Sequence, residues 1–301
     1  MTQPPTAAVP VCYRHPSRET YVRCTRCDRP ICPDCMNEAS VGHQCPECVR
    51  EGRRSMRPVR TAFGGSRAGG AAIVTKVLIV LNVVAALITA LAAGRAALAG
   101  GGGQASAVHF WGAISGLPFA YPQPDGTTAV YDGVAGGEFY RLLTSMFLHY
   151  GPLHLLLNMA GLWIFGRPLE AAFGPLRFLA LYMLAGLGGS VAVYLFEPRA
   201  LTAGASGAVY GLVGAYFVVL KRLKLDTSAV VPYLIFLILY SFIGNVSLSG
   251  HLGGLVFGAA VAAGLAYAPQ KYRTQLQIAT IAGTTVILAI LTIAWTIALN
   301  S

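Results

Sequence analysis

A serine and a histidine at the heads of apolar runs are the residues of this sequence best suited to covalent chemistry. Ser206 lies between two glycines in LTAGASGAVYGLVGAYF, residues 201–217, and His251 opens another apolar run in SGHLGG. A hydroxyl without a partner in hydrocarbon is costly, so Ser206 either bonds a helix carbonyl or takes part in a reaction. A serine facing a histidine is the minimum set for acyl transfer, because the imidazole takes the hydroxyl proton as the oxygen attacks a carbonyl.

Other polar residues of the apolar region extend this hypothesis. The nearest carboxylates in sequence, Glu197 and Asp226, have no helical spacing that would aim them at His251, so a dyad is expected rather than a triad. The tetrahedral intermediate also needs hydrogen-bond donors for its oxyanion. His154 and Asn158 are four residues apart on one helix face, and they supply side-chain N–H groups beside the backbone N–H of the serine.

The composition requires a membrane for most of the chain. Of 301 residues, 55% are hydrophobic and 11% charged, and the mean hydropathy is +0.59, which leaves too few charges to cover a soluble globule. Residues 1–70 hold 11 Lys/Arg and 6 Asp/Glu, and the other 231 residues hold the same numbers. The sequence therefore predicts a soluble N-terminal module, with no cleaved signal peptide apparent before it, followed by a polytopic all-α membrane domain.

Apolar runs of about the length that a bilayer needs predict seven membrane spans. They lie near 71–93, 152–170, 175–196, 206–220, 228–243, 251–268 and 275–298. The segment RRSMRPVRTAFGGSR before the first span carries five arginines, which by the positive-inside rule predicts a cytoplasmic N-terminus and an outer C-terminus. The later inner loops hold most of the remaining Lys and Arg, while the outer loops 197–205 and 244–250 hold only Arg199.

With this orientation, the second, fourth and sixth spans all begin at the outer face. Their first turns carry His154, Ser206 and His251 at one depth, and the short fourth span predicts that Ser206 lies below the outer surface in a wet pocket. A lone serine bonded to the carbonyl four residues earlier is the alternative, and the matching depth of the other polar residues disfavours it. Small-residue pairs on the fourth and sixth spans predict close helix packing there; they are Gly207/Gly211 and Gly254/Gly258.

One side chain near the serine has two interpretations. Tyr210, one turn after Ser206, either stacks on the His251 ring or packs as an ordinary core residue.

The motifs GASG, HYGPLHLLLN and HLGGLVFG, together with EFYRLLTSMFLH, resemble the rhomboid family of intramembrane serine proteases over about residues 70–270. The resemblance implies that Ser206 is the nucleophile and His251 the general base, with His154 and Asn158 completing the oxyanion site. It also implies a six-helix protease core at 71–270, an additional C-terminal transmembrane helix at 271–301, and transmembrane segments of other membrane proteins as substrates, cut near the outer face.

The resemblance has three further implications. The segment 101–151 corresponds to a first loop that lies partly in the outer leaflet. Its Tyr140-Arg141 pair stands where the family has Trp-Arg, and Glu170 stands where the family has a structural carboxylate at a cytoplasmic helix end.

The N-terminal module, residues 1–50, contains all seven cysteines of the chain in a pattern typical of zinc sites. The spacing C-x2-H, C-x2-C, C-x2-C, C-x2-C gives eight ligands for two tetrahedral zinc ions; they are Cys12, His15, Cys24, Cys27, Cys32, Cys35, Cys45 and Cys48. An odd number of cysteines on a reducing side of the membrane disfavours disulfides. The arrangement resembles a B-box zinc finger, which implies that alternate pairs share a metal, and His43 is an alternative ligand at the second site.

Such modules usually bind proteins, so a cytoplasmic protein partner is expected for the module. Nucleic acid is disfavoured because the basic linker 51–70 is explained by topology. Two functions are weighed for the whole chain: a membrane-embedded serine endopeptidase, or a catalytically silent adaptor that binds transmembrane helices. A transporter is disfavoured because the charged residues gather at helix ends.

Overall fold

The structure, a computed structural model, describes residues 9–55, 60–66, 72–93, 105–122, 127–243 and 246–301. The chain divides into two compact units, Met1–Pro58 and Val59–Ser301. Parts of the predicted linker 51–70, and the first residue of the span predicted at 71–93, lie outside the described residues.

The N-terminal unit has little regular structure. It contains the 3-10 turn η1 (Pro33–Cys35), the antiparallel strands β1 (Asn37–Glu38) and β2 (His43–Gln44), and helix α1 (Pro46–Ser55). Its buried cluster consists of cysteines and Ile31. A core made of thiols offers little apolar burial, so the fold of this unit needs another source of stability. Helix α1 also continues five residues past the predicted end of the module at residue 50.

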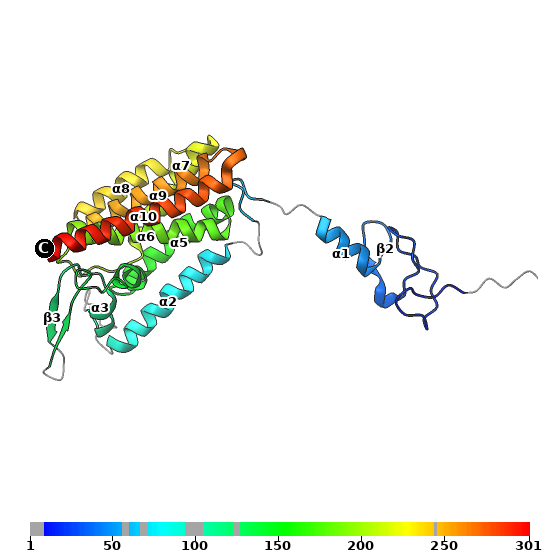
Figure 1. The fold of residues 1–301 in the computed structure, drawn as a ribbon, viewed down its shortest axis with the longest axis horizontal. Coiled ribbons are helices and arrows are strands. Elements are labelled where there is room, and N and C mark those ends of the chain that lie inside the picture. Colours follow the sequence, from blue (N-terminus) through cyan, green and yellow to red (C-terminus); the bar gives the residue numbers. More distant parts are fainter. Residues whose placement is uncertain (1–8, 56–59, 67–71, 94–104, 123–126, 244–245) are drawn as a thin grey trace, which may run out of the picture. The chain divides into compact units, whose positions relative to one another are not determined.

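Seven long helices of the described residues form the second unit (Figure 1). They are α2 (Ile73–Ala93), α5 (Pro152–Phe173), α6 (Pro175–Phe196), α7 (Ser206–Leu223), α8 (Val230–Ile243), α9 (Leu248–Tyr267) and α10 (Arg273–Asn300). Each overlaps one predicted span. Five of them, α2, α6, α7, α9 and α10, are long and apolar enough to cross a membrane. Helix α8 has only 14 residues, and α5 carries polar residues, so these two fall short by length or composition.

Helices α6, α7 and α9 pack most closely, and glycine makes this possible. A Cβ on Gly254 would overlap the carbonyl oxygen of Gly207, and a Cβ on Gly258 would overlap the backbone of Gly211. The predicted close approach of the fourth and sixth spans is therefore confirmed, with backbone against backbone. A larger residue at Gly211, Gly254 or Gly258 would force the two helices apart.

The connection between α2 and α5 is a folded subdomain. It contains α3 (Ala107–Gly112), the antiparallel hairpin of β3 (Phe119–Pro122) and β4 (Thr128–Tyr131), α4 (Arg141–Thr144) and the turn η3 (Ser145–Phe147). Residues 101–104 and 123–126 of the predicted loop lie outside the described residues. An isolated bridge between Ile114 and Thr202 joins this subdomain to the segment just before α7.

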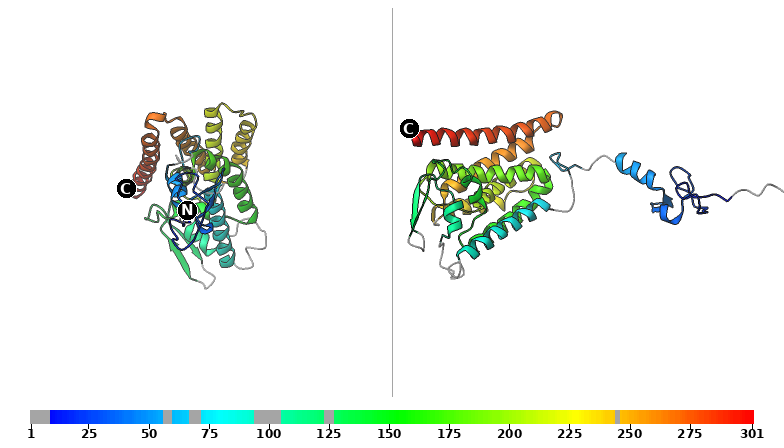
Figure 2. Two further views of the ribbon diagram at one scale, coloured as in Figure 1. Left: turned by 90° about the vertical axis from the view of Figure 1, so that its right-hand side faces the viewer. Right: turned by 60° about the horizontal axis from the view of Figure 1, so that its bottom comes forward.

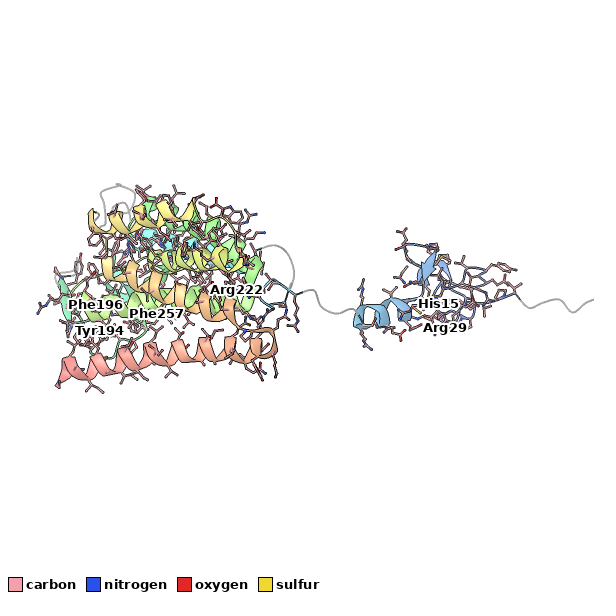
Figure 3. The ribbon with its side chains drawn as sticks, turned by 90° about the horizontal axis from the view of Figure 1, so that it is seen from above. His15, Arg29, Tyr194, Phe196, Arg222 and Phe257 are labelled. Carbon is pink, nitrogen blue, oxygen red and sulfur yellow. The ribbon has the colours of Figure 1, made fainter. Side chains whose placement is uncertain are left out.

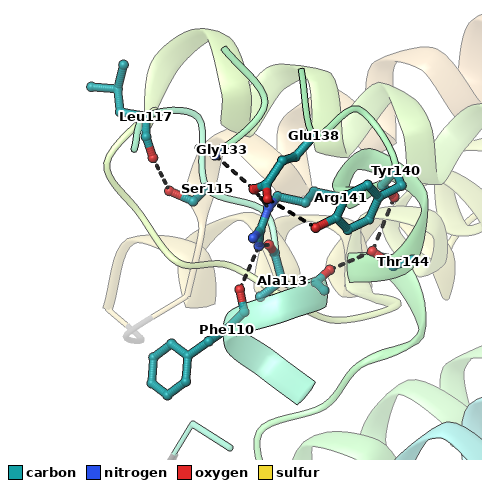
Figure 4. A network of polar contacts seen from close by, with 10 residues as sticks. Phe110, Ala113, Ser115, Leu117, Gly133, Glu138, Tyr140, Arg141 and Thr144 are labelled. Carbon is teal, nitrogen blue, oxygen red and sulfur yellow. Dashed lines mark hydrogen bonds and ion pairs between the residues drawn. The ribbon is translucent and has the colours of Figure 1, made fainter. Parts of the chain in front are cut away.

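Arg141 holds the subdomain together (Figure 4). Its side chain is fully buried, its Nε donates to the Glu138 carboxylate at 2.5 Å, and its Nη1 donates to the carbonyls of Phe110 and Ala113, both at 2.8 Å. Its neighbour Tyr140 stacks on a different residue of α3, Trp111, with ring centroids 5.0 Å apart. The arginine of the pair thus fixes the loop internally, while the tyrosine lies against the loop surface.

The C-terminal end of α5 caps the first turn of α2. The Glu170 carboxylate is 5% exposed and accepts hydrogen bonds from the backbone N–H of Val74 at 2.9 Å and of Thr75 at 2.8 Å. It also accepts one from the Thr75 hydroxyl at 2.8 Å. Because N–H groups in the first turn of a helix lack intrahelical acceptors, this carboxylate satisfies groups that would otherwise be orphaned.

Helix α10 lies along α6 and α9 at the outside of the bundle (Figure 2). At one end, the Gln277 side chain accepts from Arg177 Nε at 2.6 Å and donates to the carbonyls of Leu265 at 2.8 Å and Phe63 at 3.1 Å. Towards the other end, the Tyr194 hydroxyl, marked in Figure 3, lies 2.8 Å from Thr296 Oγ1.

The residues around Phe63 belong to the membrane unit. The Phe63 ring lies 5.0 Å from that of Phe173, and its N–H donates to the carbonyl of Ala172 at 3.2 Å. The described part of the linker predicted as 51–70 is therefore not free: residues 60–66 pack against the helix ends of the bundle.

Candidate functional site

Ser206 is the first residue of α7, and the chain before it turns on Gly204. Gly204 has φ +144°, which favours glycine, and its N–H donates to the carbonyl of Ser145 at 2.9 Å. A Cβ built on Gly204 would lie 2.8 Å from His154 Nε2 and 3.5 Å from Ser206 Oγ. The His154 ring and the Ser206 hydroxyl therefore face the same side of this glycine, and residue 204 has no room for a side chain.

His251 lies in the first turn of α9 and is fixed by an aromatic partner. Ser247 caps this helix by accepting from the N–H of Gly250 at 3.0 Å. The Tyr210 and His251 rings are stacked, with centroids 3.9 Å apart and planes 13° from parallel. Of the two interpretations of Tyr210, the structure shows the stacking one. The His251 ring is thereby held against α7 by a residue that lies one turn after Ser206.

The serine and the histidine are brought to one level by the contact between their helices. Ser206 precedes Gly207, and a Cβ on Gly207 would lie 3.2 Å from the carbonyl of Gly250, the residue before His251. Among the hydrogen bonds of the described residues, none joins the Ser206 hydroxyl to His251. Catalytic hydrogen bonds are often long in an enzyme without substrate and shorten in the complex.

His154 and Asn158 lie on the face of α5 towards this site. The backbone N–H of Tyr150 donates to His154 Nδ1 at 3.3 Å, so Nδ1 is the acceptor nitrogen of that ring and Nε2 carries the hydrogen. This donor nitrogen is the one beside Gly204. Asn158 is 5% exposed and donates one of its two N–H bonds to the His154 carbonyl at 2.9 Å, which leaves the other available.

No carboxylate of the described residues is hydrogen-bonded to His251. Glu197 accepts from the backbone N–H of Ser249 at 3.1 Å, and Asp226 is bonded to Ser228. The partner of His251 is instead Ser241 on α8, whose Oγ lies 2.7 Å from His251 Nδ1. Sequence reasoning missed this residue, although the single serine in the apolar run VVPYLIFLILYSFI was a signal that could have found it.

Two other histidines lie beside the site in the connecting subdomain. His109 Nε2 lies 3.1 Å from the carbonyl of His149, and the His149 ring meets the His154 ring edge-on at 5.1 Å. Burial, and then the neighbouring His154, lowers the pKa of His149 to about 3. His149 is therefore neutral at physiological pH and adds no positive charge next to His154.

In the N-terminal unit, the eight predicted ligands form two clusters able to hold metal ions. Within each cluster the donor atoms lie within 4.8 Å of one another. The first cluster consists of Cys12, His15, Cys32 and Cys35, and the second of Cys24, Cys27, Cys45 and Cys48. This is the alternate pairing that the B-box resemblance implied. His43 belongs to neither cluster and lies in β2 opposite Glu38.

The distances within these clusters fit tetrahedral coordination. Sγ of Cys27 and Sγ of Cys45 are 3.7 Å apart, close to the edge of about 3.8 Å expected for two thiolates at about 2.3 Å from one zinc ion. His15 Nδ1 lies 3.2 Å from Cys32 Sγ and 3.4 Å from Cys35 Sγ. Burial acts to raise the pKa of the Cys12 thiol, but hydrogen bonds from backbone N–H groups outweigh it and lower this pKa to about 6, which favours the thiolate that binds metal.

Comparison with known proteins assigns the membrane unit. The Rhomboid domain family matches residues 136–268. The chain is 40% identical over 141 residues to the putative rhomboid protease YdcA of Bacillus subtilis, a match that covers 44% of this chain and 71% of YdcA. The chain belongs to the rhomboid family. It is also 39% identical over 138 residues to the rhomboid protease GluP of the same organism, covering 44% of this chain but only 27% of GluP.

A plant relative matches over a similar stretch. RHOMBOID-like protein 6, mitochondrial, of Arabidopsis thaliana is 36% identical over 148 residues, which are 46% of this chain and 47% of that protein. The rhomboid domain contains every residue of the candidate site, namely His154, Asn158, Ser206, Ser241 and His251. It includes neither α2, nor α10, nor the metal-ligand clusters. This rhomboid is thus a multi-pass membrane protein with additional elements on both sides of the matched domain.

Proposed function

We propose that this rhomboid is a serine endopeptidase that cleaves transmembrane segments of other membrane proteins, with Ser206 as nucleophile and His251 as general base. The observation that carries the proposal is the meeting of α7 and α9 at Gly207 and Gly250, which sets the two residues side by side at the heads of their helices. The stacked ring of Tyr210 holds the imidazole in place for proton transfer.

The reaction follows from these positions. Ser206 Oγ attacks the carbonyl carbon of the scissile peptide bond while its proton passes to Nε2 of His251. The same proton then goes to the leaving nitrogen as the peptide bond breaks, which leaves an acyl ester on Ser206. His251 next takes a proton from a water molecule that attacks the ester, and the proton returns to Ser206 as the acid product leaves.

The negative charge of each tetrahedral intermediate is stabilised by groups from two helices. The backbone N–H of Ser206 lies in the first turn of α7, where N–H groups have no intrahelical acceptor. His154 Nε2 faces the same side of Gly204 as the serine hydroxyl, and Asn158 keeps one N–H bond free. Preorganised donors of this kind typically account for a large part of the rate enhancement in acyl transfer.

The orientation of the chain is part of the proposal. The arginine-rich segment before α2 places the N-terminal unit in the cytoplasm, and an odd number of spans then places the C-terminus and the entrance to the site outside. A C-terminal fusion after Ser301 tests this orientation: alkaline phosphatase, which is active only outside, should be active there, and activity of a cytoplasmic reporter instead would reverse the orientation.

The N-terminal unit is proposed to hold two structural zinc ions in its two clusters and to bind a cytoplasmic protein. Thiolates and imidazole at tetrahedral spacing are the ligands that zinc prefers, and bound zinc would supply the stability that the small apolar core cannot. Zinc has no part in the peptidase reaction in this proposal.

The proposed domains are a zinc module, a protease core and one added helix. The core consists of the six long helices α2 and α5 to α9, and α10 is the added helix.

The experiment is cleavage of a transmembrane reporter by purified protein in detergent, together with labelling by a serine-reactive fluorophosphonate. Ser206→Ala and His251→Ala should each abolish both signals, whereas Ser190→Ala, which removes another buried serine of the membrane unit, should leave them intact. Wild-type turnover in Ser206→Ala would refute the nucleophile assignment. A wild-type protein that binds the reporter helix but neither cleaves it nor is labelled would instead establish the adaptor function.

A further inference from the structure

Ser241 contributes a buried hydroxyl to the Nδ1 side of the His251 ring. The residue is 3% exposed and lies near the end of α8. Its Oγ is 2.7 Å from His251 Nδ1, 3.0 Å from the Tyr210 hydroxyl and 2.9 Å from the carbonyl of Leu237. The Tyr210 hydroxyl also donates to that carbonyl, at 2.9 Å. Three helices therefore meet in one small polar cluster.

The hydrogens available to this cluster favour one tautomer of His251. Tyr210 and Ser241 bring one hydroxyl hydrogen each, and the carbonyl of Leu237 can only accept. With Nδ1 of His251 protonated, a third hydrogen is available, and it bonds the Ser241 oxygen while Ser241 donates to Leu237. If Nδ1 carries no hydrogen, the buried cluster has only the hydroxyl hydrogens of Tyr210 and Ser241. One further short contact then has no hydrogen between its two polar atoms, which is costly in a buried site.

We propose that Ser241 is a positioning residue that holds His251 with Nδ1 protonated and Nε2 bare towards Ser206, so that Ser241 orients the base of the Ser206–His251 dyad. This inference rests on the proposed peptidase function. The geometry is that of the residue that orients the base in other nucleophile–base pairs, here supplied by a neutral hydroxyl in place of a carboxylate.

Ser241 also acts after the proton has moved. When His251 Nε2 takes the hydroxyl proton of Ser206, the ring becomes a cation whose Nδ1–H still donates to Ser241. The oxygen of Ser241 is polarised by its own bond to Leu237, so it is a better acceptor for that cation. No proton passes to Ser241 at any step, and its hydrogen stays on its own oxygen.

A purely local role would not explain the position of this side chain. A serine in an apolar helix commonly bonds the carbonyl four residues earlier, and the bond to Leu237 alone would satisfy its hydrogen. The short approach to His251 crosses from α8 to α9 and uses the remaining acceptor capacity of the oxygen. Threonine can make the same set of bonds, whereas alanine and valine can make none of them.

The kinetic test compares variants at residue 241 in the purified full chain, using the transmembrane reporter. Ser241→Ala should lower kcat by about 10- to 100-fold, the scale of one hydrogen bond to a charged group, with KM within about twofold of wild type. Ser241→Thr should recover most of the lost kcat, whereas Ser241→Val, which has the shape of the threonine variant without its hydroxyl, should not. Thr89→Val is the matched control, because it removes a buried hydroxyl bonded only to its own helix, at Ala85, and should leave kcat unchanged. Equal kcat values for the threonine and valine variants would overturn the inference.

A spectroscopic test reads the tautomer in the wild-type chain and uses a variant only to assign the signal. In protein labelled with 15N at its six histidines, the His251 signal, assigned as the one missing from His251→Gln, should show a protonated Nδ1 and a bare Nε2 at neutral pH. A protonated Nε2 would overturn the inference. If Ser206→Ala were fully active the proposed function would fail, whereas an inactive Ser206→Ala with a normal Ser241→Val would refute only the role of Ser241.

Discussion

Removal of the Glu170 carboxylate should destabilise the membrane unit by breaking the link between α5 and α2. Glu170 accepts three hydrogen bonds, from the N–H groups of Val74 and Thr75 and from the Thr75 hydroxyl. Each buried donor left without a partner costs about 1–3 kcal/mol. The hydroxyl can turn to a backbone carbonyl, so two orphaned N–H groups remain. Glu170→Ala is therefore expected to lower the free energy of unfolding by about 4 kcal/mol.

A second substitution separates this carboxylate's hydrogen bonds from a general loss of packing. Thr75→Val removes only the hydroxyl bond and should cost about 1–2 kcal/mol in the wild-type background. In the Glu170→Ala background the same change should cost almost nothing, because its acceptor has already gone, so the two residues should show a coupling energy of about 1–2 kcal/mol. Thr89→Val is the matched control on the same helix, since its hydroxyl bonds only the carbonyl of Ala85.

The assay is equilibrium unfolding in mixed micelles with increasing SDS, followed by circular dichroism, for the four members of the cycle and the control. A Glu170→Ala protein within about 1 kcal/mol of wild type would show that water replaces the carboxylate at little cost, contrary to the burial argument. An unchanged cost of Thr75→Val in both backgrounds would show that the two side chains do not interact. Either result would refute the reasoning from the capped first turn of α2.

Three further outcomes test other parts of the molecule. Asn158→Ala should lower kcat by roughly 10- to 1000-fold with little change in KM, because it removes one oxyanion donor, and a loss confined to KM would contradict that role. His15→Ala should release about one of two zinc equivalents measured by a chelating dye, whereas His43→Ala should release none, and release of an equivalent from His43→Ala would make His43 a ligand. Gln277→Leu should lower the free energy of unfolding by about 2–4 kcal/mol in the SDS assay, because Arg177 Nε and two buried carbonyls lose their hydrogen-bond partner. A variant with wild-type stability would contradict this expectation.

The sequence predicted the positions of the helices well because hydropathy and glycine spacing act locally. All seven predicted spans correspond to helices, and the pairs Gly207/Gly211 and Gly254/Gly258 lie at the closest backbone contact. The metal-ligand clusters were also predictable, since the ligands come in pairs three residues apart. These features depend on few residues close together in sequence, so a single chain is enough to show them.

What the sequence did not show depends on contacts between distant elements. Ser241 is ten residues before His251 on a different helix, and nothing in an apolar run tells which neighbour a hydroxyl meets. Helix α10 looked like an isolated added span, yet Gln277 bonds residues of three other segments. Such bonds are set by helix rotation and register, which hydropathy leaves open.

The packing of residues 60–66 changes how the two units of the chain can be separated. The composition of the basic linker 51–70 predicts that a core starting near residue 65 retains activity. In the structure Phe63 is 4% exposed, its ring packs on Phe173, and its carbonyl accepts from Gln277. A start at residue 65 would remove a buried aromatic ring, at a cost of about 3–5 kcal/mol, and leave a side chain of α10 without one acceptor. Loss of activity in that truncation would therefore report damage to the core. A chain that starts just before residue 60, with added basic residues to keep the orientation, tests instead whether the zinc module is separable from catalysis.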